Sequence, residues 1–510
     1  MLNQKTIPVA LKQILPISLI FLFFSAVGIF NHELWLDEAQ HFLIARDSDS
    51  LKEVYYNMQY DGHVRLWNFM LFFITHYISS NPLSMQVFHL LLINSTVFIF
   101  LRYAPFRLLT KLLIIGGYFF LYEYDVISRN YTPGILLLFA CCVLLADLRK
   151  NILWIAVLLI LMCNVHLFFL FAATSIAFYV FLRTFHAKQI DLRFFIFLSL
   201  FAIGIFSVIA QINIPPDNTY FHPEKTAWNS TGNFFSAFYG LSKGFLPIPF
   251  SKNGDFWNHY LYDLLPTFIK LIIAAFILVY TVALFYKNKP VLLFYLSSTL
   301  MLMIFLYVSQ MRASRYFGIF FIFFLAALWL DGYEKENIFS VSVNRLKGKK
   351  FLFYFSYFIL TCHLFSGIYA YASDVARPFS GAKNTIAFIK TNHLDSNMIV
   401  VDGYGGGPAL SAYLGTKVFY LNIDKPGSYC YWKKSYFEVP QKPLAELLDE
   451  SAYINTHSDF VLVSVRQVTS NEIHSSKSKF QFQRLAVFDN NIIKPDYYVY
   501  KVMMQKEKTP

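Results

Sequence analysis

The sequence predicts an α-helical protein that crosses a membrane many times and carries a small C-terminal α/β domain. Hydrophobic residues make up 56% of the 510 residues and charged residues only 15%, which is too apolar for one soluble core of this size. Apolar runs of membrane-spanning length recur from residue 14 to residue 372, and nothing comparable follows. We therefore expect a multi-pass membrane domain over residues 1–372 and a soluble domain over residues 373–510.

The positive charge of the chain follows its expected topology. The formal net charge is +12, and the Lys and Arg residues lie mostly in short loops between apolar runs, where positive charge stays on the cytoplasmic side. This distribution argues against nucleic acid as a partner and predicts contact with membrane lipids. With the basic N-terminus inside, the loops 31–63 and 212–262 and the C-terminal domain face the outside.

The expected number of spans is roughly eleven to thirteen. Two apolar segments, 64–78 and 85–101, precede a basic loop over residues 102–111. If both segments crossed the membrane, this loop would lie outside, against the charge rule. We therefore expect one of the two segments to be short, tilted or re-entrant.

The first outer loop, residues 31–63, predicts two helices along the membrane surface. Its apolar residues repeat at helical spacing, so that one helix face can lie on the bilayer. These residues are Trp35, Leu36, Ala39, Phe42 and Leu43. Asp37 and His41, four residues apart, share the opposite face. The second helix begins at Ser50, with Glu53 three residues on in the pattern of a capping box.

Asp37 and Glu38 are the first candidates for chemistry. Carboxylates beside a membrane are costly unless they are exposed or paired, so an adjacent pair marks a functional candidate. One of them could act as a general base on a hydroxyl or amine, or the pair could hold a divalent cation against a phosphate. Equally, Asp37 could cap its helix while Glu38 faces water. A divalent cation is the only cofactor that these residues suggest.

Further polar groups lie on the same predicted outer side. They are His63, Arg129, His166 and the pair Arg312 and Arg315, which Tyr316 follows. An Arg offers two parallel donors to a carboxylate or phosphate, although an Arg at a helix end commonly reaches to lipid headgroups instead. The Arg pair, three residues apart, suits a phosphate-bearing ligand, with an anionic phospholipid as the alternative. Each His could bind phosphate or be structural.

Two other stretches allow more than one interpretation. The loop 212–262 is rich in Pro, Asn and aromatic residues, and loops of this length serve as lids, binding elements or passive covers. In the C-terminal part, Gly403 to Pro408 follows an apolar strand, but Pro408 occupies the third glycine position of a dinucleotide fingerprint, so a tight turn is the better interpretation. Strands are expected near 398–401, 418–421, 460–465 and 497–502, and a helix near 384–390.

The order of these features resembles the GT-C superfamily of polyprenyl-phosphate-sugar-dependent glycosyltransferases, and within it the bacterial relatives of protein mannosyltransferases and aminoarabinose transferases. The elements that carry the resemblance are Trp35 to Ala39, Asp61 to Trp67, Ser128 to Tyr131 and Arg312 to Tyr316, together with the extracytoplasmic C-terminal domain. One element departs from the family pattern, because members commonly have His-Pro-Pro where this chain has His63-Val64-Arg65.

The resemblance implies a GT-C-like fold and a hexosyl- or pentosyltransferase of the cell envelope. The sugar would pass from a polyprenyl-phosphate donor to a glycan, lipid or protein acceptor, with inversion, at the outer face of a bacterial inner membrane or in the ER membrane of a eukaryote. Asp37 would be the catalytic base, and Glu38 would orient the acceptor or share a metal. Donor phosphate would be held by Arg129, Tyr131, Arg312 and Arg315. Further substrate contacts would come from His41, His63, His166 and Tyr316.

Two other functions are compatible with many apolar spans. A transporter or flippase would place ionisable residues at mid-membrane on interrupted helices and would show repeated halves, neither of which is evident here. A ligase or polymerase of O-antigen also acts on lipid-linked sugars and relies on a large outer loop, a role for which the 212–262 loop is the candidate.

Overall fold

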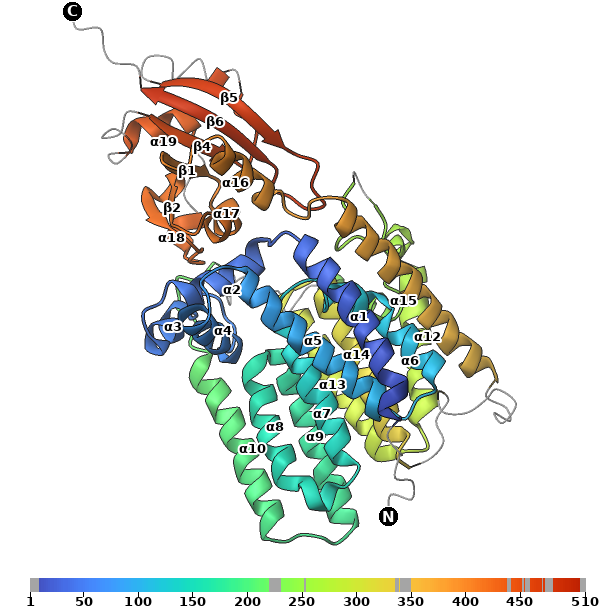
Figure 1. Ribbon diagram of the computed structural model, residues 1–510. Helices are drawn as coiled ribbons and strands as arrows, with labels where there is room; N and C mark the ends of the chain where they lie inside the picture. The colour runs from blue at the N-terminus through green and yellow to red at the C-terminus, as the bar shows by residue number, and fades with distance from the viewer. Residues whose placement is uncertain are drawn as a thin grey trace, which may run out of the picture.

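A bundle of long helices with a sheet domain at one end makes up the computed structural model (Figure 1). The structure describes residues 9–219, 231–251, 254–334, 339, 350–437, 442–451, 454, 459–469, 471–472 and 480–504. Within these ranges, nine helices are long and apolar enough to cross a membrane. They are α1 (Leu11–Asn31), α5 (Leu83–Tyr103), α8 (Leu148–Val165), α9 (Leu167–His186), α10 (Leu192–Gln211), α12 (Thr267–Phe285), α13 (Lys289–Ser309), α14 (Ser314–Asp331) and α15 (Lys350–Ala376).

The described part of the chain thus has nine helices of spanning length, fewer than the roughly eleven to thirteen spans expected, and the other helices of the bundle are shorter. They are α2 (Leu36–Arg46), α3 (Leu51–Asn57), α4 (Leu66–Tyr77), α6 (Leu108–Ile115), the π-helix η1 (Phe119–Glu123), α7 (Tyr131–Leu145), α11 (Thr231–Phe245) and the 3₁₀ turn η2 (Leu261–Leu264). The 12 residues of α4 rise only about 18 Å, less than the ~30 Å hydrocarbon core. The expectation that one of the segments 64–78 and 85–101 is short is therefore confirmed.

Helix α14 is the central element of the bundle. Every side chain from Ser314 to Asp331 except Tyr316 is buried, and α14 contacts α7, α11, α13 and η1. A helix that is apolar on all sides lies either in the interior of a protein or in lipid, and the burial of α14 shows that it lies in the interior of the bundle. Its first turn, which carries Arg315, is consequently fixed by packing. The amide of Ser314 donates to Asn258 Oδ1 at 2.7 Å, which secures the start of the helix.

The C-terminal part forms a six-stranded sheet in the order β3-β2-β1-β4-β6-β5. The strands are β1 (Met398–Asp402), β2 (Val418–Tyr420), β3 (Lys425–Gly427), β4 (Asp459–Ser464), β5 (Phe480–Phe488) and β6 (Tyr497–Met504). The helices and turns are α16 (Ala382–Thr391), η4 (Tyr404–Gly406), α17 (Gly407–Leu414), η5 (Leu421–Ile423), α18 (Lys434–Phe437) and α19 (Leu444–Glu450). The parallel strands β1, β2 and β4 are Val-rich and lie at the centre, as buried parallel strands do. The four predicted strands and the predicted helix are confirmed, whereas β3 and β5 were not predicted.

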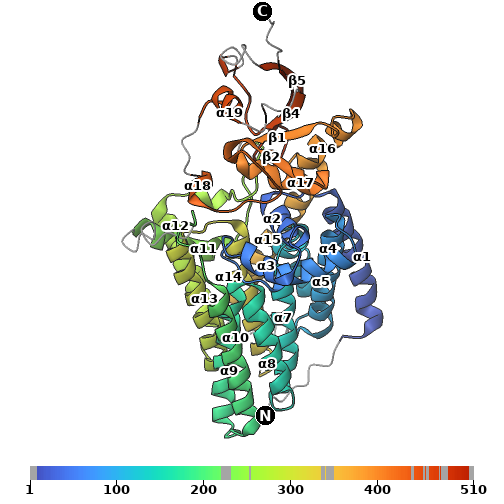
Figure 2. The same ribbon diagram turned by 90° about the vertical axis from the view of Figure 1, so that its left-hand side faces the viewer.

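Helix α2 lies between the sheet domain and the bundle. Figure 2 shows α17 over α2, and the two helices are in contact. Ala39, Phe42 and Leu43, which were expected to lie on the bilayer, are fully buried in one apolar core with residues of α4, α17 and the sheet. The predicted periodicity is right, but the apolar partner is protein, because spacing cannot distinguish lipid from protein. The division of the chain at residue 373 stays a prediction.

Part of the 212–262 loop is a packed helix. Helix α11 contacts α14, where a Cβ on Gly240 would lie 2.5 Å from the ring of Phe317 and one on Gly244 would lie 2.4 Å from its carbonyl oxygen. Glycine at these two positions therefore permits the close approach of the helices. Residues 220–230 and 252–253 of the predicted lid, binding element or cover lie outside the described residues.

Candidate active site

A cavity of about 400 Å³ lies where the first loop meets the bundle and the C-terminal domain. Its walls come from α2, the turn before α4, the loop before α7 and the α13–α14 connection. The lining residues are Asp37, Gln40, His41, Asp61, His63, Arg129, Ser309, Gln310, Met311, Arg312, Ala313, Arg315, Tyr316 and Trp432. Seven residues predicted for the site therefore line one cavity: Asp37, His41, His63, Arg129, Arg312, Arg315 and Tyr316.

Two arginines converge on the carboxylate of Asp37. Arg129 Nη1 lies 2.6 Å from Asp37 Oδ2, and Arg315 Nη2 donates to the same oxygen at 2.9 Å. Burial alone would raise the pKa of Asp37, but the two guanidinium groups outweigh burial and hold this pKa below its usual range. Asp37 is therefore ionised, and the local excess of positive charge makes the cavity suited to an anion.

Aromatic rings fix the guanidinium group of Arg315. Its Cζ lies 5.1 Å from the ring centre of Trp35, 5.5 Å from that of Trp257 and 4.7 Å from that of Tyr316. Such cation–π contacts keep a desolvated cation in place without neutralising it. Trp257 comes from the 212–262 loop and was not predicted, since nothing in its local sequence indicates a partner in α14.

Neutral histidines form another wall of the cavity. The ring centres of His41 and His63 are 5.3 Å apart, and those of His63 and His166 are 5.6 Å apart. Burial and nearby positive charge lower the pKa of His41 to about 3, and burial together with His41 lowers that of His63 to about 4. The side-chain amide nitrogen of Asn68 donates to the backbone oxygen of His41. The Oδ1 atom of Asn68 therefore lies 2.9 Å from His41 Nδ1 and accepts a hydrogen bond from it. Nε2 of His41 is then the acceptor that a substrate hydroxyl can meet.

Two predicted residues lie behind this wall. His166 is outside the lining, and its Nδ1 accepts the amide of Phe168 at 3.1 Å, which caps α9. Tyr131 is buried at the start of α7 with its ring 4.7 Å from that of His166. Arg129 Cζ lies 5.9 Å from the same tyrosine ring, so Tyr131 supports the arginine from beneath.

Asp61 is a site residue that the sequence did not reveal. Its Oδ1 accepts the indole N–H of Trp432 at 2.9 Å and the amide of Gln40 at 3.4 Å, and its Oδ2 lies 3.8 Å from His41 Nε2. Burial raises the pKa of Asp61, whereas the pKa of Asp37 is lowered. Trp432 follows Asp61 by 371 positions, and a contact at that separation leaves no local pattern.

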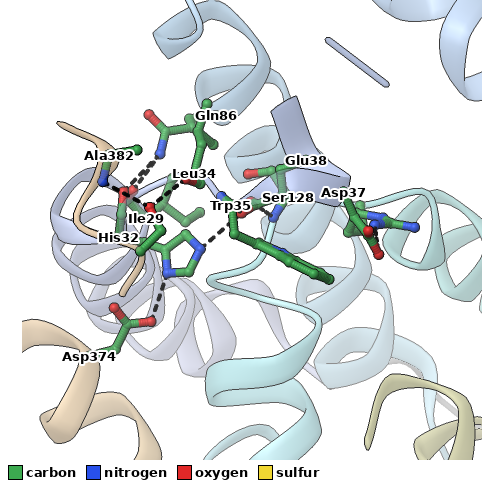
Figure 3. A network of polar contacts seen from close by, with 12 residues as sticks. Ile29, His32, Leu34, Trp35, Asp37, Glu38, Gln86, Ser128, Asp374 and Ala382 are labelled. Carbon is green, nitrogen blue, oxygen red and sulfur yellow. Dashed lines mark hydrogen bonds and ion pairs between the residues drawn. The ribbon is translucent and has the colours of Figure 1, made fainter. Parts of the chain in front are cut away.

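Glu38 is not among the residues that line the cavity, and Figure 3 shows its side chain directed away from that of Asp37. Its Oε2 lies 3.0 Å from His32 Nε2, and its Oε1 accepts the amide of Ser128 at 2.6 Å. His32 Nδ1 lies 2.7 Å from Asp374 Oδ2 on α15. Burial would lower the pKa of His32, but the carboxylates of Asp374 and Glu38 outweigh it and raise this pKa to about 10. Glu38 thus ties α2 to the loop that carries Arg129.

Replacement of His32 by Gln is expected to lower the free energy of unfolding by about 3 kcal/mol near pH 6, because two buried carboxylates lose their cation. The raised pKa of His32 determines how this stabilisation depends on pH. The stabilisation is complete below the ordinary histidine pKa of about 6.5 and is lost as the pH rises towards 10. Apparent melting temperatures in detergent between pH 5.5 and 10 test this, with the exposed His186→Gln as control. A difference between wild type and variant that does not shrink with rising pH contradicts a charged His32.

The site does not suit a divalent cation. Asp37 is already shared by two cations, and Glu38 is bound to His32 and Ser128 outside the cavity, so the two carboxylates are not placed to bind one ion together. Among the residues that the structure describes, no group of three His, Cys, Asp or Glu residues is placed to hold a metal. The possible metal role of Asp37 or Glu38 therefore has no support in the geometry.

The fold matches that of a solved membrane protein. The structure is similar to the crystal structure of ArnT from Cupriavidus metallidurans bound to undecaprenyl phosphate. The match covers 96% of this chain and 97% of the ArnT chain, with a TM-score of 0.50 and 11% identity. This likeness shows the fold alone, and it confirms the expected fold class, an α-helical polytopic membrane protein with a small C-terminal α/β domain. The chain is accordingly a multi-pass membrane protein.

A second solved structure is similar over a smaller part of its length. It is the arabinofuranosyltransferase AftD from Mycobacteria, at 11% identity and a TM-score of 0.39, with coverage of 96% of this chain and 41% of that one. No conclusion is based on it. No family model and no curated protein matches the sequence.

Proposed function

We propose that the protein is an integral-membrane glycosyltransferase that moves a sugar from a polyprenyl-phosphate donor to an extracytoplasmic acceptor. The observation that carries the proposal is the Asp37 carboxylate held by Arg129 and Arg315 at the rim of a cavity, in the fold of a protein bound to undecaprenyl phosphate. A base beside two anion-binding groups is what displacement of a phosphate by a hydroxyl or amine requires.

The donor phosphate competes with Asp37 for the two arginines. When a phosphate accepts hydrogen bonds from Arg129 and Arg315, Asp37 loses the ion pairs that hold its pKa down. Its pKa then rises, and Asp37 becomes a stronger base when the donor is in place. Arg312 and Tyr316 line the same wall and complete the phosphate-binding group.

The reaction is a single displacement at the anomeric carbon. An acceptor oxygen or nitrogen forms the new glycosidic bond, its proton passes to Asp37, and the bond between the anomeric carbon and the phosphate oxygen breaks. The electron pair leaves with the lipid phosphate, whose new charge Arg129 and Arg315 stabilise. Attack from the face opposite the phosphate inverts the anomeric centre. His41, His63 and Asp61 face the space in which the acceptor lies.

The proposed orientation places the cavity and the C-terminal domain on the outside of a bacterial inner membrane, or on the lumenal side of the ER membrane in a eukaryote. The observation that supports it is the charge asymmetry of the loops. The acceptor is then a glycan, lipid or protein that is exposed on that side.

The proposal is tested with the purified full-length protein in proteoliposomes that contain undecaprenyl-phosphate-linked hexoses and pentoses and an extract of cell-envelope glycans. We expect release of undecaprenyl phosphate together with labelled glycan. If no donor is consumed and the same proteoliposomes take up a labelled sugar without donor, the protein is a transporter and the proposal is wrong.

A further inference from the structure

A second cavity, of about 950 Å³, lies between the sheet domain and the first turn of α2. Trp35 and Leu36 form its floor, whereas the next residue, Asp37, lines the cavity described above. The remaining walls come from the C-terminal domain: the turn after β1, the segments after β2 and β4, and the residues before β6. The larger cavity therefore adjoins the proposed base.

The sheet topology places this cavity at a position where α/β proteins bind ligands. From β1 the chain passes through α17 to β2 on one side, and β4 pairs with β1 in parallel on the other side. In open sheets of this kind, ligands bind outside the carboxyl ends of the strands where the strand order reverses. Asp402 at the end of β1 and Val465 just after β4 line the cavity at this point.

The glycine-rich turn after β1 is shaped by packing rather than by a phosphate. A Cβ on Gly403 or Gly406 would lie 2.3 or 2.4 Å from the side chain of Val465, and one on Gly407 would lie 2.1 Å from Tyr420. Only Gly405 is different, because the nearest contact of its Cβ would be Leu36 Cδ2 at 3.8 Å. Glycine is thus required at three positions by close packing, while a larger side chain at position 405 would project into the cavity.

The chemistry of the walls favours an uncharged ligand that carries many hydroxyl groups. Aromatic rings alternate with polar side chains, and the rings are those of Trp35, Tyr404, Tyr436, Phe437 and Tyr497. Sugar rings present C–H groups that stack on aromatic faces, while their hydroxyls bind carboxylates and amides. Asp402 and Asn422 supply such groups.

Each cation on the walls already has a carboxylate partner. Arg466 donates to Glu472 at 2.7 Å, and its hydrogen bond lowers the pKa of Glu472 to about 2. Lys442 donates to Glu450 at 2.6 Å, and Lys494 pairs with Asp496. A phosphate would have to compete with these carboxylates for each cation, whereas a neutral sugar does not.

We propose that the cavity between the sheet domain and residues Trp35 and Leu36 binds an uncharged glycan, which is the acceptor of the transfer reaction. The role as acceptor rests on the proposed function, but glycan binding itself does not. The glycan lies on the aromatic walls and extends past Leu36, so that its terminal hydroxyl reaches Asp37.

The test is a titration of the full-length protein in nanodiscs by saturation-transfer NMR. The neutral probes are maltotriose, mannotriose and chitotriose, and the anionic probe is inorganic pyrophosphate. Gly405→Leu fills the cavity, and Phe437→Ala removes from its wall a partly exposed ring whose centre lies 5.0 Å from that of Trp432 and 5.2 Å from that of Tyr404. Gln483→Leu, on exposed β5 in the same domain, is the matched control.

We expect at least one trisaccharide to bind the wild type, with affinity lowered about tenfold in Gly405→Leu and in Phe437→Ala but not in Gln483→Leu. Sugar binding should survive Asp37→Asn, so a failure of transfer is distinguishable from a failure of this proposal. The proposal is overturned if no trisaccharide binds, if Gly405→Leu and Phe437→Ala bind sugar as well as the wild type, or if pyrophosphate displaces the sugar.

Discussion

Asp37→Asn is expected to lower the rate of sugar transfer by about 10²- to 10⁴-fold, the range that a positioned general base contributes. The amide keeps the size of the side chain but cannot accept the acceptor's proton. Because the arginines then face no competing carboxylate, donor binding should be retained or tightened. Single-turnover transfer and equilibrium binding of undecaprenyl phosphate, measured on the same preparation, separate the two effects.

Asp61→Asn is the matched control for this experiment. Asp61 lines the same cavity, but its Oδ1 is held by Trp432 and Gln40, whereas Asp37 lies beside the two arginines that would bind the donor phosphate. We therefore assign Asp61 to holding the acceptor. We expect a higher KM for the acceptor with a smaller change in turnover. Unchanged transfer in Asp37→Asn, with transfer abolished in Asp61→Asn, would move the role of base to Asp61.

Replacement of Arg129 or Arg315 by Ala is expected to weaken donor binding and to lower turnover by about 10²- to 10³-fold, as for the loss of a group that stabilises a developing oxyanion. Arg315→Lys should recover little of the loss, since a lysine cannot reproduce the stacking on Trp35, Trp257 and Tyr316. The exposed Arg193→Ala is the control. Normal donor binding in both alanine variants would contradict a phosphate at this position.

The alanine variants of Arg129 and Arg315 are also expected to change the pH dependence of kcat/KM. The two arginines keep the pKa of Asp37 below its usual value, so the wild type retains an ionised base down to acid pH. Loss of one arginine raises this pKa, and the acid limb of kcat/KM should move to higher pH. A limb that stays in place would show that Asp37 is not the titrating group.

The candidate site was predictable where local sequence carries the chemistry. Asp37 and Arg315 are 278 positions apart, yet each stood out by its charge at the end of an apolar run, and the structure brings them within 2.9 Å. Glu38 was harder to assign, because adjacent residues on a helix are about 100° apart and face different partners. Sequence adjacency therefore suggested a pair, whereas in the structure Asp37, the proposed base, lines the cavity and Glu38 binds His32 and Ser128 outside it.

Residues whose role depends on contacts between distant segments could not be predicted. Trp257 reaches the site from a loop that was interpreted only as a lid, binding element or cover, and Trp432 reaches it from the C-terminal domain. The fold was easier to predict from the sequence than the site, because long apolar runs and Val-rich strands are local signals. The edge strands β3 and β5 were missed. The sequence of β3 is Lys-Pro-Gly, which contains no residue that favours a strand, and β5 carries a register shift between Arg484 and Ala486 that breaks its alternation.

The apolar core that α2 shares with the sheet has a consequence for the evolution of such proteins. Since Ala39, Phe42 and Leu43 pack with α17 and the sheet, the first loop and the sheet domain form one packing unit. Replacement of the sheet domain alone would expose the buried face of the helix that presents Asp37. We therefore expect the first loop and the sheet domain to change together in evolution rather than independently.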